Sequence, residues 1–239
     1  MEKISITLPV FNEEKVIEKN VEELRNFLIQ NLGHDFEIII ANNGSTDGTL
    51  EKIKKICKRY GDVNYINIDE RGRGRALRKA WSENSSDIVS YMDIDLSTSL
   101  DAFPRLIKEI EEGYDIAIGS RFVKGSDTKR SFMRGFLSRG YNLLLKLFFN
   151  VSFSDAQCGF KAIRKGSLEE ILDDVKDQEW FFDTELLIKA ERKGFRIKEV
   201  PVHWIESRDS KVNILETVVG YIKSLFRLWI EYHITRNNK

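Results

Sequence analysis

Short β-rich runs alternate with segments of helical period through the first half of the chain, and this alternation limits the fold more than any other feature. It repeats often enough to predict a mostly parallel sheet with helices on both faces, an α/β class. Ligands of such sheets bind at the carboxyl ends of the strands. The predicted strands are 3–8, 36–41, 63–68, 88–92 and 114–118, and the helices are 13–32, 49–60, 75–83 and 102–112.

Two carboxylates, Asp93 and Asp95, follow the fourth predicted strand. Side chains two residues apart in an extended chain point the same way. Both carboxylates are therefore predicted to approach one hard cation that also binds phosphate oxygens. The pair alone is weak evidence, because strands often end in Asp for turn formation. Loops at the same edge strengthen the hypothesis.

Composition describes a globular chain with one uneven feature. Of 239 residues, 41% are apolar, which is enough for the core of one large domain. Basic and acidic residues number 38 each, so total charge gives no indication of a nucleic-acid partner. Between Gly119 and Arg164, nine Lys or Arg stand against two Asp, a local charge of +7. This block predicts an anionic partner against one face.

Cysteine usage and hydropathy favour a cytoplasmic setting. Cys57 and Cys158 have no paired spacing, and three histidines do not suggest a structural zinc site. The N-terminus leads directly into a predicted strand, without the apolar region of a signal peptide. No stretch reaches eighteen uninterrupted apolar residues, so any membrane contact is expected to be peripheral.

The first two loops at the expected ligand edge suit either local structure or binding. Pro9 ends strand pairing, and Asn12 can cap the next helix. Asn42 and Asn43 end the second strand, and their amides suit the edge of a nucleobase. An ordinary polar turn explains the same residues.

The third loop, residues 71–76, places three arginines around two glycines. Glycines before a helix, with an acidic residue about twenty positions on, also occur in dinucleotide-binding loops. That alternative is disfavoured, because Leu77 occupies the third glycine position and the loop follows the third strand. The arginines, Arg73 among them, instead indicate a nucleotide phosphate contact.

Two segments in the second half have broad apolar faces with a polar stripe. We expect both apolar faces to pack on the core, with a membrane interface for one or both helices as the alternative. The chain then divides into a catalytic domain over 1–211 and an amphipathic helix over 212–239. In 131–149 the apolar face contains Phe136, Leu137, Tyr141, Leu144, Leu145 and Phe148, and the stripe contains Arg134, Ser138, Asn142 and Lys146. In 212–234 the polar face contains Glu216, Lys223, Arg227 and Glu231.

Nine segments carry a resemblance to a known family: PVFNE (9–13), NGSTDGT (43–49), GRG (72–74), DID (93–95), GSRF (119–122), DAQCGFK (155–161), WFFDTELL (180–187), EVPV (199–202) and WIESRDSK (204–211). Their order and spacing resemble family 2 inverting glycosyltransferases with a GT-A fold. The later segments are similar to the dolichyl-phosphate glucose and mannose synthase branch, and most similar to the dolichyl-phosphate beta-glucosyltransferases.

The resemblance implies transfer of a sugar from a nucleotide diphosphate to polyprenyl or dolichyl monophosphate at the cytoplasmic face of a membrane. Interfacial helices or a membrane-anchoring protein would supply access to the lipid. The expected cofactor is Mg²⁺ or Mn²⁺. By matching positions, the metal contacts are Asp93, Asp95 and Ser97, and the nucleoside contacts are Pro9, Phe11, Glu13 and Asn43. Arg121 matches a position that binds a donor or acceptor phosphate, and the predicted contacts to the acceptor phosphate are Arg134, Ser138, Arg208 and Lys211.

A phosphomonoester acceptor needs no catalytic base, since its second pKa is near 6 and its oxygen is anionic at pH 7. The expected catalytic groups are Asp95, through the metal, and Arg121, through charge neutralisation. Asp183 is the third residue predicted for the catalytic site, and the role favoured for it is structural or positioning. In the alternative, a family 2 enzyme acting on a saccharide hydroxyl, Asp183 would be the base.

The donor favoured by resemblance is UDP-glucose, with GDP-mannose and UDP-N-acetylglucosamine as alternatives. The chain lacks a Gln-x-x-Arg-Trp sequence, which argues against the processive synthases. A noncatalytic nucleotide-sugar-binding protein is a further alternative, opposed by the presence of both Asp93 and Asp95 beside a basic cluster.

Overall fold

The computed structural model describes residues 2–206 and 214–237. Its strands are β1 (Ile4–Val10), β2 (Phe36–Asn43), β3 (Val63–Ile68), β4 (Ile88–Met92), β5 (Ile116–Ser120), β6 (Asp127–Lys129), β7 (Phe160–Arg164), β8 (Ile197–Pro201) and β9 (His203–Ile205). Its helices are α1 (Ile17–Asn31), α2 (Thr49–Arg59), α3 (Arg73–Ser82), α4 (Phe103–Glu111), α5 (Phe132–Phe149), α6 (Lys165–Ile171), α7 (Phe182–Arg192) and α8 (Ile214–Asn237).

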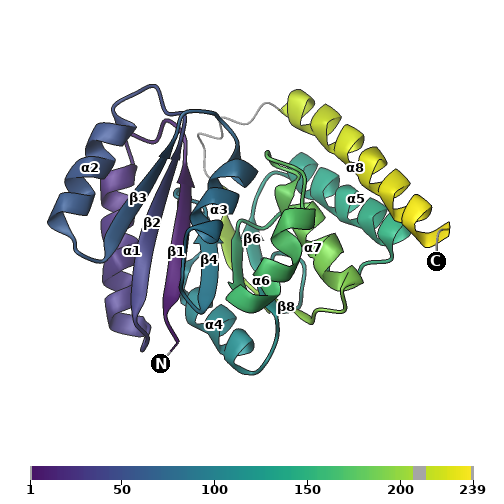
Figure 1. Cartoon of the computed structure of the whole chain (residues 1–239), viewed down its shortest axis with the longest axis horizontal. Coiled ribbons are helices and arrows are strands. Elements are labelled where there is room, and N and C mark those ends of the chain that lie inside the picture. Colours follow the sequence, from purple (N-terminus) through teal and green to yellow (C-terminus); the bar gives the residue numbers. More distant parts are fainter. Residues whose placement is uncertain (1, 207–213, 238–239) are drawn as a thin grey trace.

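A seven-stranded sheet of order β3-β2-β1-β4-β7-β5-β8 forms the centre of the molecule (Figure 1). β7 pairs antiparallel with β4 and β5, and the other neighbouring pairs are parallel. A small second sheet joins β6 to β9. The α/β prediction is confirmed, although the sequence pattern gave no indication that β7 would enter the sheet between two strands of the first half.

Helices cover both faces of the sheet and bury two apolar layers. Val21 and Leu24 of α1 belong to one layer, together with residues of α2 and α4. Trp81 of α3 and Phe182 of α7 belong to the other. Each fully buried side chain of this size contributes about 1.5–3 kcal/mol relative to leaving it exposed. These layers hold the strand ends at fixed positions.

The first helix begins later than predicted. α1 begins at Ile17 rather than at Glu13. Asn12 has a left-handed backbone with φ 56°, and its side-chain carbonyl accepts the Thr46 N–H at 2.7 Å. Asn12 therefore ties the first loop to the second instead of capping the helix.

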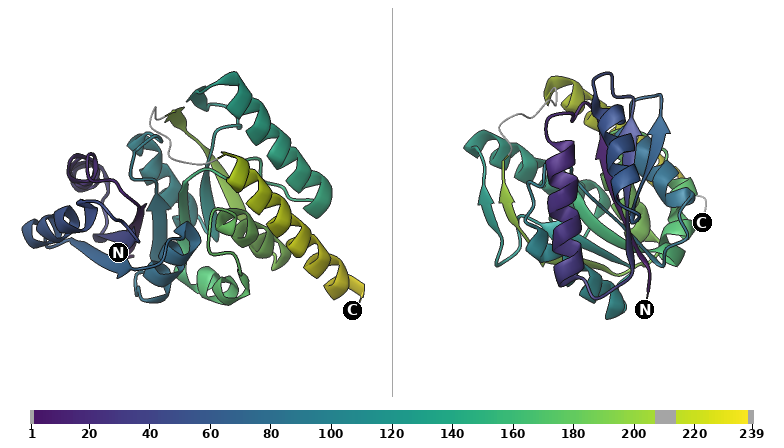
Figure 2. Two further views of the ribbon diagram at one scale, coloured as in Figure 1. Left: turned by 90° about the horizontal axis from the view of Figure 1, so that it is seen from above. Right: turned by 90° about the vertical axis from the view of Figure 1, so that its left-hand side faces the viewer.

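The helices α5 and α8 lie side by side on the outside of the second layer (Figure 2). They run in the same direction, because Tyr141 contacts Tyr221 at 5.1 Å between ring centroids and Phe149 contacts Tyr232 at 6.0 Å. None of the helices in the described ranges combines the length and apolar character that a bilayer crossing requires.

The expectation that the apolar face of α5 packs on the core is confirmed only in part: Leu145 is fully buried and Tyr141 packs against the second layer, but the rest of the face is exposed. Phe136 is 65% exposed, whereas Ser138 and Asn142 of the polar stripe are buried. These buried polar groups are stabilised because they are hydrogen-bonded. The Asn142 side-chain carbonyl accepts the Ala156 N–H at 3.0 Å, and the Asn142 side-chain amide donates to the Ser138 backbone carbonyl. The exposed apolar residues of α5 are Met133, Phe136, Leu137, Leu143, Leu144, Leu147 and Phe148.

In α8 the expectation is likewise confirmed only in part: Leu225 and Trp229 pack against the second layer, but charged residues of the polar face also turn inward. Arg227 donates to both carboxylate oxygens of buried Glu185 at 3.1 and 2.6 Å, and Glu231 pairs with Lys189 at 2.6 Å. The charged face thus packs against α7, while Ile222, Phe226 and Ile230 are exposed. The side chain of Glu216 lies outside the described residues.

Candidate active site

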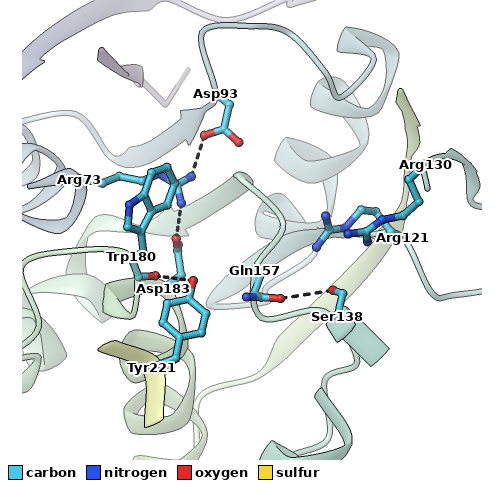
Figure 3. Close-up of a pocket in the computed structure, with 9 residues that line it drawn as sticks. All are labelled: Arg73, Asp93, Arg121, Arg130, Ser138, Gln157, Trp180, Asp183 and Tyr221. Carbon is cyan, nitrogen blue, oxygen red and sulfur yellow. Dashed lines mark hydrogen bonds and ion pairs between the residues drawn. The ribbon is translucent and has the colours of Figure 1, made fainter. Parts of the chain in front are cut away.

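The carboxyl ends of the parallel strands converge on a cavity of about 230 Å³ (Figure 3). β7 is antiparallel to its neighbours, so the residues that precede it lie at the same edge of the sheet as the carboxyl ends of the parallel strands. There, Asp93 donates its N–H to the Gly159 carbonyl at 3.2 Å. The lining residues are Arg73, Asp93, Arg121, Arg130, Ser138, Gln157, Trp180, Asp183 and Tyr221.

Arg73 bridges two of the predicted carboxylates, Asp93 and Asp183, in one wall of the cavity. Its guanidinium donates to Asp93 at 2.8 Å and to Asp183 at 2.9 Å, and it lies over the Trp180 ring at 5.0 Å. Burial disfavours its charge, but Asp93, Tyr91 and Asp183 outweigh that cost and raise the pKa of Arg73. The arginine is permanently cationic and holds this wall of the cavity together.

Asp183 is surrounded by hydrogen-bond donors. Besides Arg73, it accepts a hydrogen bond from the Tyr91 hydroxyl, and the Lys161 ammonium lies 3.1 Å from it. Lys161 is fully buried and also donates to Tyr91 at 3.0 Å. Both oxygens of the carboxylate are thus occupied, which supports a positioning role.

The carboxylate pair has a geometry that the sequence did not predict. Asp93 to Leu96 form a tight turn in which the Leu96 N–H donates to the Asp93 carbonyl, and Leu96 has φ 51°. The turn buries Ile94 and leaves Asp95 exposed. The argument from an extended chain is therefore wrong, although both carboxylates remain at the end of β4.

The residues around Asp93 fit a divalent cation. Desolvation raises the pKa of Asp93; the charge of Arg73 opposes this, and the negative charges of Asp95 and Asp183 add to it, so that the pKa is raised. Carboxylate oxygens are the ligands that Mg²⁺ and Mn²⁺ prefer. A Cβ at Gly159 would overlap the Asp93 carboxylate, so glycine there gives the carboxylate its space. Ser97 donates its N–H to Asp95 at 3.0 Å, and its predicted metal contact stays a prediction.

Arg121 follows β5 and is fixed by a bidentate ion pair. Its Nε and Nη2 donate to fully buried Asp155 at 2.7 and 2.8 Å. Burial opposes the charge, but Asp155 outweighs it and raises the pKa of Arg121. The guanidinium lies 5.4 Å from the Trp204 ring centroid. Arg121 is therefore held rigidly in the cavity wall, as its predicted catalytic role requires.

The predicted nucleoside residues lie on the rim made by the first three loops. Asn43 donates to the Val10 carbonyl at 3.2 Å and accepts the Gly72 N–H at 3.0 Å, so its amide joins all three. Phe11 lies under the Arg71 guanidinium at 4.3 Å. Glu13 donates its N–H to Thr49 at 2.8 Å. Pro9 lies inside β1 opposite Ala41 and pairing continues to Val10, so the prediction that Pro9 ends strand pairing is wrong. Their contacts to a nucleoside stay predictions.

The predicted acceptor residues are separated in the structure. Ser138 lines the cavity and lies 3.3 Å from the Gln157 side-chain oxygen. Arg134, one turn earlier on α5, instead pairs with Glu206 outside the cavity lining. Arg208 and Lys211 lie outside the described residues.

Much of the basic block is neutralised within the protein. Three carboxylates from outside the block pair with its cations: Asp183 with Lys161, Glu206 with Arg134, and Glu2 with Arg164 at 2.8 Å. The local charge of +7 therefore overstates the positive charge available to a partner.

Sequence reasoning missed four residues of the lining: Arg130, Gln157, Trp180 and Tyr221. Gln157 and Trp180 stand in segments that carried the family resemblance, so that signal was available. Arg130 was counted only as one charge of the basic block. Tyr221 depends on how α8 docks, and its hydroxyl donates to the Trp180 carbonyl at 3.2 Å.

A mostly parallel sheet with a carboxylate pair at the end of β4 and cationic walls defines the GT-A class of nucleotide-sugar transferases. A solved structure of this fold is glucosyl-3-phosphoglycerate synthase from Mycobacterium tuberculosis, in complex with Mn²⁺, uridine-diphosphate and phosphoglyceric acid. The similarity has a TM-score of 0.70 at 21% identity and covers 94% of this chain and 76% of that one. The family model Glycosyl transferase family 2 matches residues 5–172. The chain belongs to this family and is a glycosyltransferase.

Curated relatives are similar over most of the chain. The dolichyl-phosphate beta-glucosyltransferase of Saccharomyces cerevisiae is 30% identical over 99% of this chain and 77% of its own length. The corresponding Trichomonas vaginalis enzyme is 34% identical over 88% of this chain and 68% of its own. Glycosyltransferase AglD of Haloferax volcanii is 36% identical over 95% of this chain, which spans 37% of that relative.

Proposed function

We propose that the protein transfers a hexose, with inversion, from a nucleotide-diphosphate sugar to polyprenyl or dolichyl monophosphate. The observation that carries the proposal is one cavity with two chemically different sides: the Asp93 carboxylate at the end of β4, with Asp95 close by in the sequence, and Arg121 and Arg130 toward α5 (Figure 3). A metal diphosphate suits the first side and a phosphate monoester suits the second.

The donor side uses the predicted metal and nucleoside residues. Asp93 and Asp95 would hold a divalent cation, which supplies charge neutralisation for the departing nucleoside diphosphate. The rim around Asn43 and Phe11 is the place for the nucleoside. UDP-glucose is the favoured donor, because several similar proteins are named dolichyl-phosphate beta-glucosyltransferase and the Mycobacterium tuberculosis structure contains uridine-diphosphate and Mn²⁺.

The transfer step needs alignment and charge rather than a base. An oxygen of the acceptor phosphate forms a bond to the anomeric carbon as the bond from that carbon to the diphosphate breaks. Arg121 stabilises the negative charge, and Asp183 positions Arg73. A saccharide hydroxyl as acceptor would require Asp183 as base, and the occupied oxygens of Asp183 weaken that alternative.

A membrane surface is the proposed site of the reaction, on its cytoplasmic face. The exposed apolar residues of α5 and α8 lie on neighbouring helices, with exposed Arg139, Lys146 and Lys223 among them. Apolar side chains bordered by basic ones suit an interface with anionic lipids. Ser138 and Tyr221 reach the cavity from these same two helices, so a lipid phosphate would have a short path to it.

The proposal is tested by transfer of radiolabel from UDP-glucose, GDP-mannose and UDP-N-acetylglucosamine to polyprenyl or dolichyl phosphate, with Mg²⁺, Mn²⁺ or EDTA. We expect a metal-dependent lipid-linked hexose, formed most rapidly from UDP-glucose. Asp95→Asn should abolish transfer without changing the circular dichroism spectrum. Hydrolysis of the donor, or transfer only to a saccharide, would contradict the proposed acceptor.

A further inference from the structure

Arg130 lies in the cavity wall directly before α5, and its guanidinium is held 5.3 Å from the Trp204 ring centroid. Its Nε and Nη1 atoms are buried and have no hydrogen-bond partner among residues 2–206 and 214–237. Figure 3 shows Arg130 beside Arg121, on the side of the cavity away from Arg73 and Trp180. Two guanidinium groups thus meet at one end of the site.

The neighbouring arginines each have a carboxylate of their own. Arg73 has Asp93 and Asp183, Arg121 has Asp155, and Arg134 has Glu206. In the described ranges, no such ion pair is formed by Arg130. Buried donors without a partner are costly, and a cation beside a second cation is more costly still. Desolvation, followed by the charge of Arg121, lowers the pKa of Arg130, and the nearby charges of Asp155 and Glu206 offset this only in part. A bound anion would relieve both costs.

We infer that Arg130 donates to the phosphate of the acceptor. The inference rests on the proposed function and names the residue that recognises the acceptor at that site. The phosphate that Arg130 contacts could instead belong to the donor. However, the proposed donor side is that of Asp93 and its partner Arg73, and Figure 3 shows Arg130 on the opposite side of the cavity from Arg73. Ser138, from the exposed helix α5, lies on the same side as Arg130.

Arg130 acts here only through charge and hydrogen bonds. It stays protonated throughout, since guanidinium groups do not titrate near neutral pH. The acceptor phosphate oxygen forms the new bond to the anomeric carbon, and the nucleoside diphosphate leaves with the electron pair of the broken bond. Trp204 restricts the side chain, so less conformational entropy is lost when the phosphate binds.

The test uses Arg130→Gln in the full chain, with Lys129→Gln as a control. Lys129 is the adjacent cation but is exposed. Binding of geranyl monophosphate, a water-soluble isoprenyl phosphate, and of UDP-glucose with Mn²⁺ is measured by calorimetry, and KM is measured for both substrates. Arg130→Gln should weaken geranyl monophosphate binding roughly 10-fold to 100-fold, the effect of losing hydrogen bonds to a charged group. Donor binding should change less than about 2-fold.

The outcomes separate this inference from the proposed function. If the unaltered protein binds geranyl monophosphate through Arg130 but transfers no sugar to it or to a longer lipid phosphate, the assigned phosphate site stands and the proposed reaction fails. If Arg130→Gln weakens UDP-glucose binding instead, the arginine serves the donor and the inference is overturned. Equal binding of geranyl monophosphate by Arg130→Gln and the unaltered protein, or none by either, also overturns it.

Discussion

Replacing Lys161 by methionine tests whether the buried charges behind the cavity wall are mutually dependent. The ammonium is fully buried and contacts Asp183, Tyr91 and the carbonyls of Ala156 and Cys158 at 2.6–3.1 Å. Methionine fills similar volume but leaves Asp183 with one cation fewer. Breaking a buried ion pair from one side costs about 3–5 kcal/mol. At about 2–4 °C per kcal/mol for a chain of this size, Tm should fall by roughly 6–20 °C.

The assay is urea and thermal unfolding followed by circular dichroism, with Lys124→Met as the control because Lys124 is exposed. Asp183→Asn and the double variant complete a double-mutant cycle. If the two charges stabilise one another, the double variant should be less destabilised than the sum of the single variants by about 1–3 kcal/mol. A Lys161→Met variant within about 1 kcal/mol of the unaltered protein, or strictly additive effects, would refute the reasoning.

Three further variants test other parts of the site. Gly159→Ala should reduce metal-dependent transfer roughly 100-fold, because the added methyl group would displace the Asp93 carboxylate, a proposed metal ligand. Gly166→Ala, where a Cβ has open space, should leave transfer unchanged, and equal activity of the two variants would contradict the proposed metal site. Tyr221→Phe should lower kcat several-fold, because the Tyr221 hydroxyl holds the loop at Trp180 by a hydrogen bond. Tyr232→Phe on the same helix is the control, and an unchanged kcat in Tyr221→Phe would exclude a positioning role for Tyr221. Phe136→Glu should weaken binding to anionic phospholipid vesicles by about 10-fold or more, measured by co-sedimentation, and unchanged binding would argue against the proposed surface.

The strand positions and the ligand edge were predictable because they depend on local periodicity and on the parallel sheet. Strands 63–68 and 88–92 were predicted with their observed bounds. Asp93 and Arg121 reach the cavity because each directly follows a strand. These relations need no knowledge of distant contacts.

The orientation of α5 and α8 was not predictable, since periodicity groups residues on a helix face but does not say which face is buried. Asn142 is inside because Ala156, in the segment that follows α5, donates its N–H to the Asn142 side chain. Lys161 looked like one charge of a basic surface, yet Asp183 and Tyr91 hold it at the centre of the protein. Such pairings arise only in the folded chain.

The place of β7 in the sheet has a consequence for how the chain acquires its structure. During synthesis β4 and β5 are both made before β7, yet neither pairs directly with the other, because β7 lies between them. Until Phe160–Arg164 leaves the ribosome, each presents an open edge where unwanted pairing can begin. The proposed donor and acceptor walls are joined by that same late strand. A chain truncated before β7 should therefore retain β3-β2-β1-β4 at most, and the two walls should appear in a single cooperative folding event.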